Sequence, residues 1–171
     1  MIIALPRSGT TWAANWLNTG DSYCVHDPLW TTHYSYLDRA VTERAAGRAA
    51  GISCTGLWRW PAWVNGHPAR KLVLHRPVAA IDRSLGALGL PALPREATGL
   101  LASIAGRHAD YTELFDPTKA EVLWDYLTGG LPFNPVRHAE LRQLRIEPQF
   151  AHIAADPAVT RALRAELSRG Q

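Results

Sequence analysis

The sequence predicts a three-layer α/β/α fold with a mainly parallel sheet. Apolar strand patterns alternate with helical patterns along the chain, and each strand is a run of consecutive apolar residues. Strands that are apolar on both faces are typical of a parallel sheet covered by helices on both sides. With 171 residues and no visible linker or internal repeat, the chain is expected to form one domain, residues 1–171, around a single core.

The first half of the chain alternates regularly between the two patterns. Strands are predicted where β-prone apolar residues run together between turn signals, at residues 2–5, 22–29, 52–57 and 71–75. Helices are predicted where apolar residues share one side of a helical repeat, at residues 10–17, 33–48 and 78–88.

The second half of the chain is more helical in pattern. A long helical pattern covers residues 95–115, and a candidate last strand follows at residues 121–126. A short helix is expected near residues 136–144 and a terminal helix at about residues 157–167, with prolines between them.

Composition narrows the class of partner. The net charge of +3 and the pI near 9.1 are mildly basic, but the arginines are scattered, so a nucleic-acid-binding surface is not indicated. A small anionic ligand would explain this charge equally well. Cys24 and Cys54 lie in apolar strands, as expected for buried thiols in a reducing cytoplasm. No apolar stretch approaches the roughly 20 residues of a membrane span, and the first residues lack the features of a signal peptide. We therefore expect a cytoplasmic protein without a membrane partner.

The turn between the first predicted strand and helix has the residues of an anion site. A strand that turns into a helix leaves several backbone N–H groups pointing at one place. Gly9 allows close approach there, Ser8, Thr10 and Thr11 offer hydroxyl donors, and Arg7 adds a permanent charge. The alternative is an ordinary turn and helix N-cap. The segment lacks the G-x-x-x-x-G-K-[ST] spacing of the usual ATP- or GTP-binding loop.

Residues 6–12 read P-R-S-G-T-T-W and resemble the phosphosulfate-binding loop of the sulfotransferases, usually P-K-S-G-T-T-W, with Arg7 in place of the lysine. The family also has an arginine at the end of a later strand and a serine eight positions further on, which Arg76 and Ser84 match. The resemblance implies a P-loop nucleotide-binding fold and transfer of a sulfuryl group from 3′-phosphoadenosine 5′-phosphosulfate (PAPS) to a hydroxyl or amine, with adenosine 3′,5′-bisphosphate as product.

The same resemblance implies roles for individual residues. Residues 7–11 would hold the phosphosulfate, with Arg7 neutralising charge on the leaving 5′-phosphate, and Arg76 and Ser84 would bind the 3′-phosphate. Trp12 would stack on the adenine, and its alternative role is packing between helix and sheet.

A general base is expected at the end of the second strand. Carbohydrate-modifying and several bacterial sulfotransferases carry a Glu-Pro pair there, and Asp27-Pro28 is similar. Asp27 is the first candidate and His26 the second, and because adjacent strand residues point to opposite sides, only one of them is expected to face the site. The alternative is a structural turn at Asp27 and a structural histidine. No metal is required in this scheme.

The acceptor is expected to be a small molecule or a carbohydrate. Trp58, Trp60 and Trp63, with Trp30, could line its cleft, or they could serve packing alone. The late basic segment that closes over the donor in typical sulfotransferases has no clear counterpart, and its candidate replacements are Arg137, Arg142 and Arg145.

Two other functions compete with sulfuryl transfer. One is a small P-loop kinase or phosphotransferase, against which the missing loop lysine argues. The other is a non-catalytic module that kept the fold and the nucleotide site.

Overall fold

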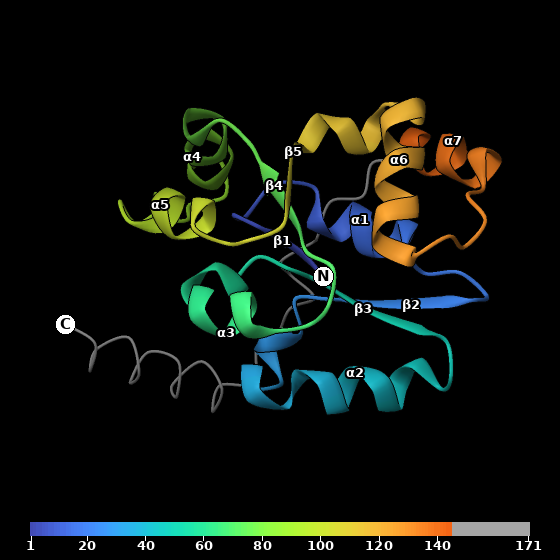
Figure 1. The fold of residues 1–171 in the computed structure, drawn as a ribbon. Coiled ribbons are helices and arrows are strands. Elements are labelled where there is room, and N and C mark those ends of the chain that lie inside the picture. Colours follow the sequence, from blue (N-terminus) through green and yellow to red (C-terminus); the bar gives the residue numbers. More distant parts are fainter. Residues whose placement is uncertain (145–171) are drawn as a thin grey trace.

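The computed structural model describes residues 1–144 and contains a five-stranded sheet (Figure 1). All strand pairs are parallel and the order is β2-β3-β1-β4-β5. The strands are β1 (Ile2–Ala4), β2 (Ser22–His26), β3 (Ala49–Cys54), β4 (Leu72–His75) and β5 (Arg107–Asp110). β1 is central, and its Ile3 pairs with Cys54 of β3 and Val73 of β4.

Helices cover both faces of the sheet, as Figure 1 shows. The α-helices are α1 (Thr10–Trp16), α2 (Leu37–Ala45), α3 (Pro61–Gly66), α4 (Val78–Gly86), α5 (Ala97–Ala102), α6 (Pro117–Thr128) and α7 (Pro135–Gln143). Short 3₁₀ turns lie in the segments between strands and helices, namely η1 (Pro28–Trp30), η2 (Tyr34–Tyr36), η3 (Leu57–Arg59) and η4 (Tyr111–Phe115).

Two hydrophobic layers result from the alternation of side chains along the strands. Ile2 and Leu72 pack against α1, α6 and α7 on one face, whereas Ile3 and Val73 pack against α2, α3, α4 and α5 on the other. The α/β architecture with a parallel sheet and helices on both faces is therefore confirmed. Among residues 1–144, no helix has both the length and the apolar character needed to cross a membrane.

The predicted strands and helices of the first half of the chain are confirmed, with ends that differ by a few residues. Cys24 and Cys54 lie in β2 and β3 as free, buried thiols. Burial is the main cause that raises the pKa of each thiol to about 12, so neither is a reactive thiolate near neutral pH.

The single long helix predicted at residues 95–115 is wrong. The chain leaves α5 at Ser103, forms β5 and then turns through η4. Gly106 allows β5 to approach β4 at this point, because a Cβ at residue 106 would lie 2.6 Å from the carbonyl oxygen of Lys71, just before β4. In β5, at the edge of the sheet, Ala109 is buried whereas His108 and Asp110 are exposed, so the strand lacks the apolar run that predicts the others.

The last strand predicted at residues 121–126 is also wrong, because these residues belong to α6. Asp116 caps this helix by accepting hydrogen bonds from the N–H groups of Thr118 and Lys119, and Pro117 occupies its first turn. The short helix near residues 136–144 is confirmed as α7. The predicted terminal helix at residues 157–167 and Arg145 lie outside the described residues.

Candidate functional site

The candidate site lies at the carboxyl ends of the strands. β1 and β4 are neighbours in the sheet, yet the chain leaves them in opposite directions, toward β2 and toward β5. In open α/β sheets such a switch point opens a crevice at the carboxyl edge, and ligands bind there. The loop after β1 and the residues after β4 therefore leave the sheet side by side at this edge.

The loop after β1 has an unusual backbone. Arg7 and Gly9 both adopt left-handed conformations, with φ of 65° and 80°, and such residues are typical of loops whose N–H groups converge on an anion. Between them, Ser8 is fully buried, and its hydroxyl has no hydrogen-bonding partner within residues 1–144. Because a buried hydroxyl without a partner is unfavourable, Ser8 fits a loop that receives a polar ligand.

Residues from three elements meet beside this loop. The Nε of Arg7 donates a hydrogen bond of 2.9 Å to the hydroxyl of Ser84 in α4. The guanidinium of Arg76, directly after β4, donates to the carbonyl oxygen of Arg7 and lies 4.8 Å from the ring centroid of Tyr111. The predicted anchoring residues Arg7, Arg76 and Ser84 are thus brought together.

Arg7 and Arg76 form no ion pair with a carboxylate of residues 1–144. The Nε of Arg76 is buried and has no hydrogen-bonding partner in the described part of the chain. Guanidinium groups with spare donors, next to hydroxyls and backbone N–H groups, are the donors that a phosphate- or sulfate-like anion requires.

Asp27 lies one residue beyond β2 and is held by the loop after β3. Its backbone is left-handed, with φ of 42°, and its N–H donates to the carbonyl of Ser53 at 2.9 Å. Its carboxylate accepts hydrogen bonds from the N–H of Thr55 at 2.5 Å and from the Thr55 hydroxyl at 3.0 Å. The backbone N–H and the carboxylate of Asp27 are therefore both held by β3 and the turn that follows it.

His26 contacts both Asp27 and the anion loop. Its Nε2 lies 3.1 Å from the hydroxyl of Thr10, 3.2 Å from that of Thr11 and 3.3 Å from the Asp27 carboxylate. The prediction that only one of His26 and Asp27 faces the site is therefore wrong. Asp27 is no longer in strand conformation, and its left-handed backbone turns the carboxylate back beside the ring.

His26 is partly buried, and burial lowers the pKa of its imidazole, while the charge of Asp27 acts in the opposite direction. All of its contacts with Thr10, Thr11 and Asp27 go through the same ring nitrogen. A serine-protease type of triad would need the carboxylate at one nitrogen and the hydroxyl at the other. The arrangement is therefore not a nucleophile, histidine and carboxylate relay.

Trp12 belongs to the core. It is 5% exposed, its indole N–H donates to the carbonyl of Leu141 at 3.0 Å, and its ring packs against Trp16, Phe115 and His138. Stacking on adenine would require the ring to leave these contacts. We therefore assign Trp12 to packing, the second of its two predicted roles, as a correction to the role implied by the resemblance.

The other candidate tryptophans differ in exposure. Trp58 is buried, and its indole N–H donates to the carbonyl of Thr55, so it supports the turn that holds Asp27. Trp60 and Trp63 are partly buried against Tyr34, with ring centroids 5.0 and 5.6 Å from the Tyr34 ring. Trp30, two residues after Pro28, is 47% exposed.

The predicted basic clamp is not formed by Arg137. The guanidinium of Arg137 donates to the carbonyl oxygens of Asn15 and Asn18 at the end of α1. It therefore caps a helix C-terminus, a common structural use of arginine.

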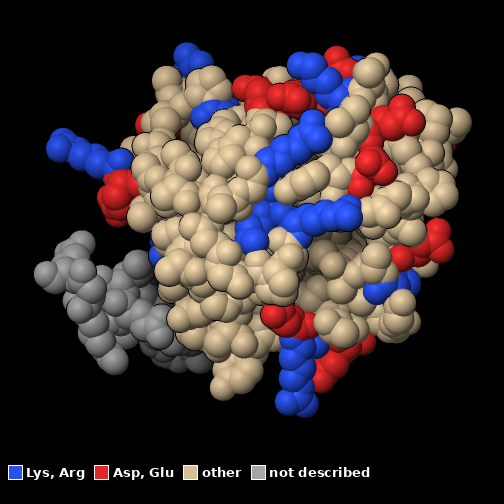
Figure 2. Space-filling model, in the orientation of Figure 1, with Lys and Arg blue, Asp and Glu red and all other residues tan. Residues whose placement is uncertain are grey.

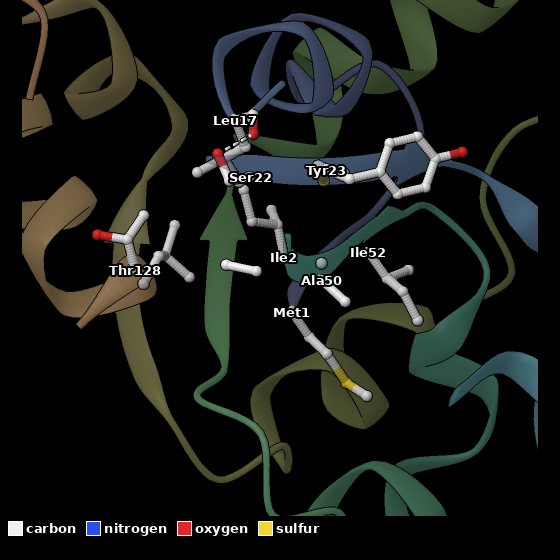
Figure 3. A pocket seen from close by; sticks show the side chains of 12 residues that line it. Met1, Ile2, Leu17, Ser22, Tyr23, Ala50, Ile52 and Thr128 are labelled. Carbon is white, nitrogen blue, oxygen red and sulfur yellow. Dashed lines mark hydrogen bonds between the residues drawn. The ribbon is translucent and has the colours of Figure 1, made fainter. Parts of the chain in front are cut away.

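The amino end of the sheet has different properties. Two cations just before β4 have structural partners there: Arg70 donates to the carbonyl of Tyr126, and Lys71 to that of His67. In Figure 2, basic side chains gather near the middle of the face shown. A cavity of about 70 Å³ lies at the amino end, between the starts of β1, β2 and β3 and the end of α6 (Figure 3). It is too small for a nucleotide, and none of the predicted site residues lines it.

Sequence reasoning missed Thr55 and Tyr111. Each directly follows a strand, β3 or β5, at the carboxyl edge of the sheet. The rule that selected Asp27 and Arg76, that functional residues follow parallel strands, would also have selected these two. Thr55 was missed because its strand was expected to continue to residue 57, and Tyr111 because β5 was not predicted.

Comparison with known proteins identifies no relative of this chain: no family model, no curated protein and no solved structure matches it.

Proposed function

We propose that the chain is a sulfotransferase that uses PAPS as donor, in a domain of the P-loop nucleotide-binding type. One observation carries the proposal: Arg7 and Ser84, 77 positions apart, share a hydrogen bond, and Arg76 contacts the same loop. These residues belong to the two separate parts of the sulfotransferase phosphate signature. A doubly phosphorylated nucleotide needs two anchoring points side by side, and their proximity supports that ligand.

The proposed donor site has two parts. The loop of residues 7–11 would hold the 5′-phosphosulfate through backbone N–H groups and the hydroxyls of Ser8, Thr10 and Thr11. Arg76 and Ser84 would bind the 3′-phosphate, with Arg7 between the two groups. The unpartnered Ser8 hydroxyl and Arg76 Nε support this arrangement, since each would gain a partner and each buried polar group left without one costs about 1–3 kcal/mol.

Asp27 is the proposed general base. In the transfer, the acceptor oxygen or nitrogen forms a bond to sulfur while the bond from sulfur to the 5′-phosphate oxygen breaks, and that oxygen keeps the electron pair. The proton of the acceptor passes to the Asp27 carboxylate, and Arg7 neutralises the charge on the leaving phosphate. Thr55 holds the carboxylate in place through its N–H and hydroxyl.

A nucleotide-binding module without turnover is the second candidate. It is favoured by the environment of Asp27, because both carboxylate oxygens already have contacts, one with Thr55 alone and one with Thr55 and His26. This candidate shares the nucleotide site of the enzyme and differs only in lacking product formation.

Calorimetric titration with adenosine 3′,5′-bisphosphate, and in parallel with ATP and Mg²⁺, tests the proposal. Hydrogen bonds to charged groups contribute about 1.5–3 kcal/mol, so Arg76→Ala and Ser84→Ala are each expected to weaken binding of the bisphosphate by about 10- to 150-fold. Arg83→Ala is the matched control, because Arg83 is exposed and adjacent to Ser84 in α4.

Unchanged affinity in both site variants would refute the nucleotide site, and binding of ATP with Mg²⁺ in preference to the bisphosphate would favour a phosphotransferase. Sulfuryl transfer from PAPS to phenol and carbohydrate acceptors then separates the enzyme from the module.

A further inference from the structure

We propose that His26 is a positioning residue of the anion loop, which directs the hydroxyl hydrogens of Thr10 and Thr11 toward the bound anion. The inference rests on the proposed function, since it assigns a role within the same donor site. His26 then acts on the ligand through the two threonines, and it is not the proton acceptor of the reaction.

The first step is the protonation of Nε2. This nitrogen lies 3.3 Å from the Asp27 carboxylate, and an ionised carboxylate only accepts hydrogen bonds. A lone pair on Nε2 would be repelled by that nearby negative charge, whereas an N–H there is attracted to it. Nε2 therefore carries the hydrogen of the neutral ring, and it is a donor to the oxygens around it.

The second step concerns the two hydroxyls. Nε2 lies 3.1 Å from Thr10 Oγ1 and 3.2 Å from Thr11 Oγ1, so the two hydroxyl oxygens share its one hydrogen as acceptors. A hydroxyl that accepts in this way keeps its own hydrogen for another acceptor. Within residues 1–144 neither hydroxyl makes a further hydrogen bond, so both hydrogens are available to an anion in the loop.

The third step is the rigidity of the arrangement. Thr10 is buried, and its backbone carbonyl accepts a hydrogen bond of 2.8 Å from the Ser53 hydroxyl in β3. On the other side, Thr55 fixes Asp27, and Asp27 lies against the ring of His26. The loop is therefore connected to β2 through His26 and to β3 through Ser53. Its hydroxyls are oriented before the anion arrives, which lowers the entropic cost of binding.

Three variants test this role by calorimetric titration with adenosine 3′,5′-bisphosphate. His26→Phe keeps a ring and removes the donor, and we expect it to weaken binding about 10-fold or more. His26→Gln supplies an amide N–H near the position of Nε2, and we expect it to restore affinity to within about 3-fold of the wild type. His33→Phe is the control, because His33 is exposed in another turn. Thermal melting of each variant confirms that it is folded.

A cycle with Thr11→Val adds a readout that a general packing defect would not produce. If His26 acts through the hydroxyl, the loss in the His26→Phe, Thr11→Val double variant is smaller than the product of the two single losses. Wild-type affinity in folded His26→Phe, or equal losses in His26→Phe and His26→Gln, would overturn the inference and leave the nucleotide site standing. Failure of the wild type to bind the bisphosphate would instead remove both proposals.

Discussion

Replacing Trp12 separates its two possible roles, because a core residue and an adenine platform respond differently to the same substitution. Trp12 is 5% exposed and makes one hydrogen bond, to the carbonyl of Leu141. Trp12→Phe keeps an aromatic ring but removes the indole N–H and part of the ring volume. Leaving a buried carbonyl without its partner costs about 1–3 kcal/mol, and a full truncation to alanine costs about 3–5 kcal/mol.

Urea unfolding followed by circular dichroism measures the loss. We expect Trp12→Phe to unfold at a lower urea concentration with an unchanged dependence of free energy on urea, and to bind adenosine 3′,5′-bisphosphate with wild-type affinity. Trp30→Phe is the matched control, since Trp30 is 47% exposed and surface substitutions usually change stability by less than about 0.5 kcal/mol.

The opposite result would refute the core assignment. A Trp12→Phe variant with wild-type stability, weaker binding of the bisphosphate and unchanged binding of inorganic phosphate would show that the ring contacts the base. The phosphate measurement is needed because it reports the loop without the adenine.

Three further predictions follow from the site and from the sheet. Asp27→Asn is expected to abolish sulfuryl transfer while binding of adenosine 3′,5′-bisphosphate is kept, and full turnover would remove Asp27 from the mechanism. Gly106→Ala is expected to lower the urea midpoint strongly, because a Cβ there lies 2.6 Å from the carbonyl oxygen just before β4, whereas Gly20→Ala, with open space around it, is a control expected to change the midpoint little. The free energy of unfolding should fall as the pH is lowered from 7 to 5, because burial lowers the pKa of His26 and His75 below the ordinary value of 6.5 and the unfolded chain then binds more protons. A smaller decrease in His26→Gln checks the first of these contributions, and an identical pH profile would contradict it.

The parts of the fold that the sequence predicts are those where burial on both faces requires apolar residues. β1 (Ile2–Ala4) and the first three residues of β4 are fully buried apolar runs, so both strands are easily recognised. β5 pairs with one neighbour only, so its polar residues are tolerated and its pattern is lost. In α6, the adjacent residues Val122, Leu123 and Trp124 look like a strand, but the cap at Asp116 fixes the helix and leaves Val122 exposed.

For the site, the sequence identifies residues better than it identifies their contacts. Arg7, Arg76 and Ser84 are found through their motifs, and the parallel sheet brings them together. The contact of His26 with Thr10 and Thr11 is not predictable in the same way, because it depends on the left-handed backbone of Asp27. Non-glycine residues rarely adopt the left-handed conformation, and an aspartate in the sequence does not indicate it.

The meeting of the two phosphate motifs has a topological basis that does not depend on their distance in the sequence. β1 and β4 pair in parallel, with Ala4 opposite Leu74, so the segments that follow them must leave the sheet at the same edge. Any chain with this strand order places the loop after β1 beside the residue after β4. The neighbourhood of Arg7 and Arg76 is therefore a property of the fold, whereas the hydrogen bond from Arg7 to Ser84 depends on the side chains. For this reason Ser84→Ala is a more specific test of the proposed donor site than any change that moves the sheet.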